Sequence, residues 1–136
     1  MSRKAIILCG GYGSRLRPMT TVINKHLLPV AGKPMVYYPL ALAIQSGFDD
    51  ILISTNEEHI APFRDLLGCG KEFGVRITYS YQSDKGGGIA AAIKESAPFT
   101  HGDAFAVFLG DNIVFGPSIA KNIRSTYDDI STRPVP

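Results

Sequence analysis

The chain has 136 residues, a formal net charge of +2 and a hydrophobic content of 45%, which is ordinary for one globular domain. No apolar run approaches the ~20 residues that cross a bilayer, and the N-terminal apolar stretch is too short for a secretory signal. We therefore expect a cytoplasmic protein with no membrane partner. Its two cysteines are too few for a disulfide framework, and its three histidines share no metal-binding spacing, so both sets are expected to be structural.

Strand and helix patterns alternate along the chain. Strands are predicted at residues 5–9, 50–55, 75–81 and 104–109. Helices are predicted at residues 34–46, 57–67, 88–97 and 118–127. This alternation predicts an α/β fold with a Rossmann-like, mostly parallel sheet and helices on both faces.

The predicted domain covers residues 1–127. Residues 128–136 lose the helical periodicity and contain two prolines, which predicts a linker-like tail. Such a tail suggests that a further domain follows in a longer chain.

A glycine-rich segment directly follows the first predicted strand. Gly10, Gly11 and Gly13 leave the backbone N–H groups unshielded, so that these groups can approach an anion closely. Arg15 and Lys25 add positive charge. The spacing fits neither a P-loop nor a dinucleotide fingerprint. The segment predicts a polyphosphate site, and the alternative is a glycine-rich turn with solvated arginines.

The charge distribution supports a small anionic ligand. Residues 1–48 contain six Lys and Arg side chains and no Asp or Glu, so no carboxylate there would repel a polyphosphate. These basic residues are few and have no accompanying aromatic stripe, so no nucleic-acid partner is expected.

Three segments should meet at one edge of the sheet, because parallel strands bring their carboxyl ends together. They are the glycine-rich segment after the first strand, residues 82–88 after the third, and Gly110-Asp111 after the fourth. The sequence therefore predicts a single active site at this edge.

The motifs closely resemble those of the sugar-phosphate nucleotidylyltransferases, and most of all the N-terminal half of the glucose-1-phosphate thymidylyltransferases. The resemblance is carried by residues 10–20 (GGYGSRLRPMT), 24–30 (NKHLLPV), 33–35 (KPM), 88–92 (GIAAA) and 110–112 (GDN). It implies a minimal version of the nucleotide-diphospho-sugar transferase fold.

The resemblance also implies the chemistry: a phosphate or phosphonate oxygen attacks the α-phosphorus of a nucleoside triphosphate and pyrophosphate leaves. Arg15 and Lys25 match the catalytic positions. Asp111 matches the ligand of Mg²⁺, the implied cofactor; its alternative is a polar cap after the strand. The implied nucleotide-binding residues are Leu8, Gly10, Gly11, Gly13, Ser14, Gln82, Ser83, Gly87 and Gly88.

The motifs specify the nucleotide base and the acceptor less closely than they specify the reaction. Gln82 matches the base-reading glutamine, but its spacing to Gly88 is one residue longer than in the thymidylyltransferases, so Ser83 is an alternative. The chain is shorter than the sugar-nucleotide enzymes, which favours a minimal cytidylyltransferase domain as in the bifunctional enzymes of fosfomycin synthesis. CTP and 2-hydroxyethylphosphonate are then the expected pair. The alternatives are a truncated sugar-1-phosphate thymidylyltransferase, which uses dTTP, and a non-catalytic nucleotide-binding regulatory module.

Overall fold

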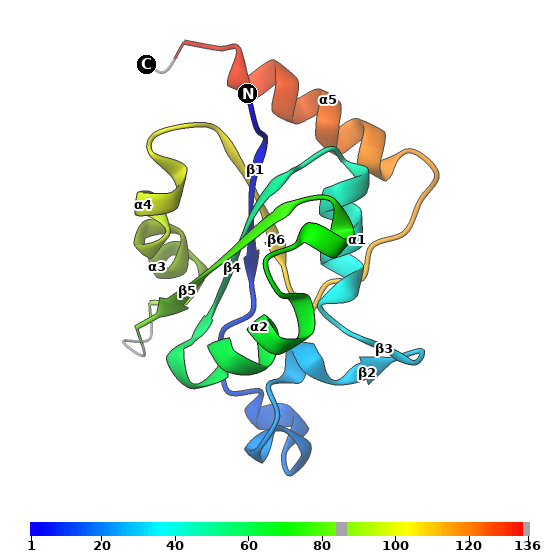
Figure 1. Cartoon of the computed structure of the whole chain (residues 1–136), viewed down its shortest axis with the longest axis vertical. Helices are drawn as coiled ribbons and strands as arrows, with labels where there is room; N and C mark the ends of the chain where they lie inside the picture. Colours follow the sequence, from blue (N-terminus) through cyan, green and yellow to red (C-terminus); the bar gives the residue numbers. More distant parts are fainter. Residues whose placement is uncertain (84–86, 135–136) are drawn as a thin grey trace.

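A four-stranded parallel sheet forms the centre of the molecule in the computed structural model, which describes residues 1–83 and 87–134. Its strands are β1 (Lys4–Leu8), β4 (Asp50–Asn56), β5 (Arg76–Gln82) and β6 (Phe105–Leu109). They lie in the order β5-β4-β1-β6 (Figure 1). A short antiparallel ladder, β2 (Pro29–Val30) with β3 (Lys33–Pro34), lies apart from it. The predicted Rossmann-like α/β sheet is confirmed.

Helices cover both faces of the sheet, as predicted (Figure 1). One face carries α1 (Tyr37–Gln45), α2 (Ile60–Leu67) and α5 (Ile119–Ser131), and the other carries α3 (Gly88–Glu95) and α4 (Ala97–Thr100). Ile6 and Ile7, which point to opposite faces of β1, are both fully buried. A strand buried on both sides needs an unbroken apolar run, and residues 5–8 supply one.

Helix α5 continues past Tyr127, where the predicted domain ended. Tyr127 packs edge-to-face on Phe48 at 5.0 Å between ring centroids, and its hydroxyl donates to the carbonyl of Ala104 at 2.9 Å. One residue further, Asp128 accepts from Arg3 at 2.9 Å. These contacts hold the helix to Ser131, so residues 128–131 are helical rather than linker. The division into a domain and a tail beyond them stays a prediction.

The predicted helix over residues 88–97 is interrupted. Helix α3 ends at Glu95 and α4 begins at Ala97. Pro98 has no N–H to donate to the carbonyl four residues earlier, and its ring clashes there, so the helix cannot run through it. The hydroxyl of buried Ser96 donates to the carbonyl of Ala92 at 2.8 Å across the break.

The other predicted boundaries differ only slightly. Each strand of the four-stranded sheet begins and ends within one residue of its predicted bounds, whereas β2 and β3 were not predicted. Residues 34–36 precede α1 because Pro34 belongs to β3, and residues 57–59 form a 3₁₀ turn before α2. Among the residues described, no helix combines the length and apolar character needed to cross a membrane.

Candidate active site

An open cleft of about 420 Å³ lies at the carboxyl ends of the strands, where the sequence predicted a site. It is bounded by the segments that follow β1, β5 and β6 and by α3. The predicted residues that line it are Leu8, Gly10, Gly11, Lys25, Gln82, Ser83, Gly87, Gly88 and Asp111. The expected convergence on one edge of the sheet is therefore seen in the structure.

The glycines permit one close approach and one backbone conformation that a side chain would disfavour. A Cβ on Gly10 would lie 2.1 Å from Oε1 of Gln82, so only glycine leaves room for that amide. Gly11 adopts a φ of 98°, which favours glycine, and its N–H donates to Oδ1 of Asn56 at 2.9 Å. The glycine-rich segment thus lies against the ends of β4 and β5.

Lys25 and Asp111 face each other at the cleft, although 86 positions separate them in sequence. Nζ of Lys25 donates to Oδ2 of Asp111 at 2.9 Å. This hydrogen bond, opposed by partial burial, holds the pKa of the Asp111 carboxyl below its usual value. In this arrangement the lysine ammonium is suited to binding a phosphate, and the carboxylate is suited to binding a cation.

Asp111 suits Mg²⁺ chemically, because a carboxylate oxygen is the hard ligand that this ion prefers. Among residues 1–83 and 87–134, no three His, Cys, Asp or Glu side chains gather as they would in an all-protein metal cage. Asp111 would therefore hold the ion together with water and phosphate oxygens, as Mg²⁺ bound to nucleotides commonly is.

Asn24 fixes the turn that carries Lys25. Its Oδ1 accepts from the backbone N–H of His26 at 2.9 Å and lies 2.7 Å from Nδ1 of the same residue. Its Nδ2 donates to the carbonyl of Cys9 at 3.1 Å, next to the glycines. Asn24 is buried, so these bonds join the lysine turn to the end of β1 away from solvent.

His26 is a cleft residue that the sequence analysis treated as structural. Burial, and then the charge of Lys25, lower its pKa to about 4. The imidazole is therefore neutral at physiological pH. Its position directly after Lys25 in the 24–30 motif was the available signal. Cys9, by contrast, is buried with its pKa raised by burial, as expected of a packing residue.

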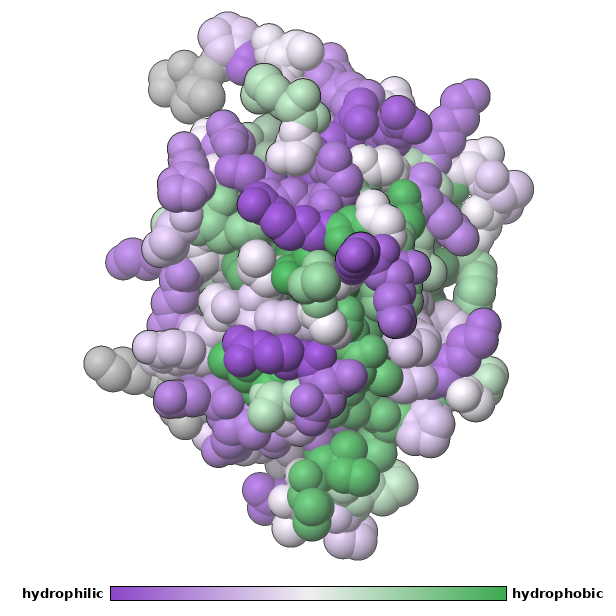
Figure 2. All heavy atoms as spheres, viewed as in Figure 1, coloured by the Kyte–Doolittle hydropathy of each residue, from purple (hydrophilic) through white to green (hydrophobic). Residues whose placement is uncertain are grey.

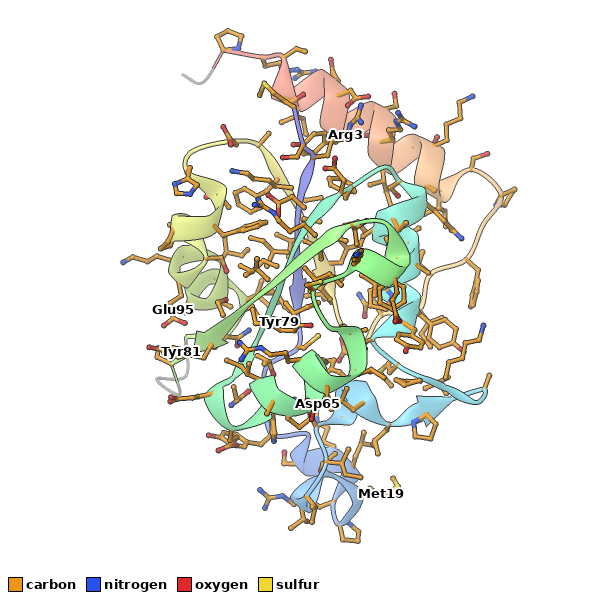
Figure 3. All side chains as sticks on the ribbon, viewed as in Figure 1. Arg3, Met19, Asp65, Tyr79, Tyr81 and Glu95 are labelled. Carbon is orange, nitrogen blue, oxygen red and sulfur yellow. The ribbon has the colours of Figure 1, made fainter. Side chains whose placement is uncertain are left out.

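The two candidates for base recognition lie side by side at the end of β5. Nε2 of Gln82 donates to Ser54, while the backbone N–H of Ser83 donates to Glu95 at 3.0 Å. The hydroxyl of Ser83 also donates to the Glu95 carboxylate. Figure 3 shows Glu95 on α3 close to Tyr81 near the end of β5. Glu95 and Asn56 line the cleft and were missed, because only folding brings them to the loops.

Three predicted residues, Gly13, Ser14 and Arg15, do not line the cleft. Arg15 lies on the exposed 3₁₀ helix η1 (Ser14–Leu16). The hydroxyl of Thr20 donates to the carbonyl of Gly13 at 2.6 Å, which folds the loop upon itself rather than over the cleft. Exposed apolar side chains, Met19 at 59% and Val22 at 86%, gather at its tip, the lower end of the molecule in Figure 2.

A parallel α/β sheet whose strand ends carry a glycine-rich loop, a lysine and an opposing aspartate is typical of a nucleotide-binding protein. The match to the Nucleotidyl transferase family model over residues 4–132 makes the assignment specific: the chain belongs to this family.

Known relatives agree with this assignment. Glucose-1-phosphate thymidylyltransferases of Mycolicibacterium smegmatis and Neisseria meningitidis are 44% and 43% identical over 121 residues. That alignment is 89% of this chain but 42% of each relative, so the chain spans about two fifths of their length.

Solved structures show the same fold. A Bacillus anthracis protein described as a glucose-1-phosphate thymidylyltransferase superimposes with a TM-score of 0.85 at 44% identity, covering 93% of this chain and 51% of that one. An apo UDP-glucose pyrophosphorylase, 22% identical with a TM-score of 0.80, covers 96% of this chain and 56% of that one and shares the fold. The resemblance to the thymidylyltransferases is thus confirmed, whereas these relatives lend no support to the expected cytidylyltransferase.

Proposed function

We propose that this chain forms the nucleotide-binding and transfer site of a sugar-1-phosphate nucleotidylyltransferase, with dTTP and glucose 1-phosphate as substrates. An oxygen of the sugar phosphate attacks the α-phosphorus, the bond from that phosphorus to the bridging oxygen breaks, and pyrophosphate leaves. The observation that carries the proposal is the Lys25–Asp111 pair, 2.9 Å apart at the cleft beside the glycine-rich loop.

The residues of the cleft suit this reaction because it brings two anions together. The demand is therefore for charge neutralisation and in-line positioning rather than proton transfer. Lys25 would place its ammonium near the α-phosphate, and backbone N–H groups of the glycine-rich segment would receive the other phosphates. Mg²⁺ held by Asp111 would supply further neutralisation of phosphate charge. The neutral His26 beside them adds no competing charge.

The substrates come from the relatives' names rather than from the cleft. Relatives that are 44% and 43% identical are glucose-1-phosphate thymidylyltransferases, which favours a sugar-1-phosphate thymidylyltransferase over a cytidylyltransferase. The pair of CTP and 2-hydroxyethylphosphonate has no such support and becomes one arm of the test. The non-catalytic nucleotide-binding module is the second alternative that the test addresses.

The test is a matrix of reactions followed by ³¹P NMR. The chain is mixed with Mg²⁺, one of dTTP, UTP, CTP or ATP, and either glucose 1-phosphate or 2-hydroxyethylphosphonate. We expect pyrophosphate and the mixed anhydride to form fastest from dTTP and glucose 1-phosphate. If only CTP with 2-hydroxyethylphosphonate reacts, the proposed substrates are wrong. If nucleotide binds but no pair reacts, the chain is a non-catalytic nucleotide-binding module.

An aspartate pair provides the matched control. Asp111→Asn should lower turnover at least a hundredfold, as expected when a group that stabilises the transition state is lost. Asp103 also accepts from a lysine, Lys4 at 2.7 Å, but lies outside the cleft. Asp103→Asn should leave turnover near normal. Equal losses in both variants would indicate a general effect of breaking an ion pair.

A further inference from the structure

The side-chain amide of Gln82 is held in one orientation. Its Nε2 donates to the hydroxyl of Ser54 at 3.1 Å and to the backbone carbonyl of the same residue at 3.3 Å. A carbonyl oxygen accepts and never donates, so the nitrogen end of the amide must face Ser54. The usual ambiguity between the two ends of a glutamine amide is thereby removed.

The opposite end of the amide, Oε1, lies against Gly10, and both Gln82 and Gly10 line the cleft. It sits so close to Gly10 that a Cβ there would lie 2.1 Å away. Among the residues that the structure describes, no donor hydrogen-bonds to this oxygen. Because both hydrogens of Nε2 have acceptors on Ser54, Gln82 offers the cleft an acceptor.

Ser54 is buried in the middle of the sheet. It lies on the inner strand β4, is 1% exposed, and its carbonyl also accepts from the backbone N–H of Cys9 at 2.7 Å. The register pairs it with Leu8 on β1 and Ser80 on β5. Ser54 therefore ties the start of the glycine-rich segment to the Gln82 side chain.

We infer that Ser54 is a positioning residue for base selection, acting through Gln82; this inference rests on the proposed function. With Oε1 turned to the cleft, the site accepts a base that brings an N–H to that point, as N3–H of thymine or uracil does. N3 of cytosine would bring a lone pair against the oxygen, which is repulsive. Without the Ser54 hydroxyl, Nε2 keeps only the Ser54 carbonyl at 3.3 Å, which also accepts from the N–H of Cys9. The amide is then held less firmly in this orientation, so the discrimination weakens.

The test measures the dissociation constants of dTTP and CTP with Mg²⁺ by calorimetry, without an acceptor. The ratio of the CTP to the dTTP constant should fall about three- to tenfold in Ser54→Ala, the effect of one neutral hydrogen bond. Ser54→Thr keeps a hydroxyl and should restore the ratio. Ser54→Cys, with a weak sulfur acceptor, is a second probe that should reduce the ratio if the alanine variant does not fold.

Thr78→Val is the matched control, because it removes a buried hydroxyl of the sheet that has no hydrogen-bond partner in the described structure. Its ratio should equal that of the wild type. A ratio that stays constant in Ser54→Ala and Ser54→Cys, while both nucleotides weaken equally, would overturn the inference and leave the proposed function standing. A wild-type chain that binds neither nucleotide would overturn the proposed function, and the inference with it.

Discussion

Lys25 forms an ion pair with Asp111 at the cleft. Before nucleotide binds, each group neutralises the other, so neither charge is left unpaired at the cleft. In the proposed function, the Lys25 ammonium would bind phosphate and the Asp111 carboxylate would hold the cation once a triphosphate is bound. The lowered pKa of Asp111 keeps its carboxylate ionised at neutral pH.

His26 should make the stability of the fold depend on pH. Its pKa is about 4 in the folded chain and 6.5 when exposed. Above pH 6.5 the ring is neutral in both states and folding is unaffected. As the pH falls from 6.5 to 4, the His26 imidazole becomes protonated in the unfolded chain but stays largely neutral in the folded chain. The free energy of unfolding therefore declines by about 3 kcal/mol.

Urea unfolding of the wild type and His26→Gln across this pH range measures the effect. The difference in unfolding free energy between them should shift against the wild type as the pH falls. His101→Gln, at an exposed position, is the matched control for the loss of an imidazole. A parallel pH dependence in the wild type and His26→Gln would show that His26 is not the cause.

Arg15 remains a predicted catalytic residue, although the structure places it outside the cleft. If its loop closes on bound triphosphate, Arg15→Ala should lower kcat about a hundred- to a thousandfold. Arg15→Lys should also fail substantially, because an ammonium does not reproduce the guanidinium fork. Steady-state kinetics, with circular dichroism to confirm folding, measures both.

Arg17 supplies the control for Arg15, since it is exposed in the same loop and carries the same charge. Arg17→Ala should change kcat only slightly. Near-normal turnover by Arg15→Ala, or equal losses from both substitutions, would remove Arg15 from the mechanism.

At the scale of elements, α5 is docked through Tyr127. The ring contacts Phe48 and the hydroxyl donates to Ala104, so two kinds of interaction can be separated. Tyr127→Phe should lower the free energy of unfolding by about 1 kcal/mol, the contribution of one hydrogen bond. Tyr127→Ala should lower it by about 2–4 kcal/mol through lost packing.

Urea unfolding at neutral pH measures these changes. Tyr81→Phe is the control for the hydroxyl, because Tyr81 is 59% exposed; its effect should be close to zero. A negligible loss in Tyr127→Ala would mean that α5 contributes little to the fold.

At the scale of the whole molecule, the cleft draws on loops from both halves of the chain, so a ligand there should stabilise the complete fold. Nucleotide with Mg²⁺ at one hundred times its Kd should raise the free energy of unfolding by about 2.7 kcal/mol. Thermal unfolding with and without dTTP measures this gain. Asp111→Asn should abolish most of it, whereas an unchanged wild-type melting temperature at saturation would contradict binding in the cleft.

Much of the fold could be read from the sequence, because its determinants are local. Apolar runs of strand length alternate with helical patterns, and each predicted strand was placed to within one residue. The glycine-rich segment, Gln82 and Asp111 follow strands, and parallel strands bring such segments to one edge. Their meeting at a cleft therefore followed from chain order alone.

The tertiary structure decided which atoms meet there. Lys25 reaches Asp111 across 86 positions, and Gln82 reaches Ser54 across 28. No local pattern encodes such contacts, which is why neither pairing follows from the sequence. Arg15 stands outside the cleft on the exposed turn Ser14–Leu16. Periodicity determines which segments are strands and helices, whereas the direction and partner of each polar side chain depend on packing between segments distant in the chain.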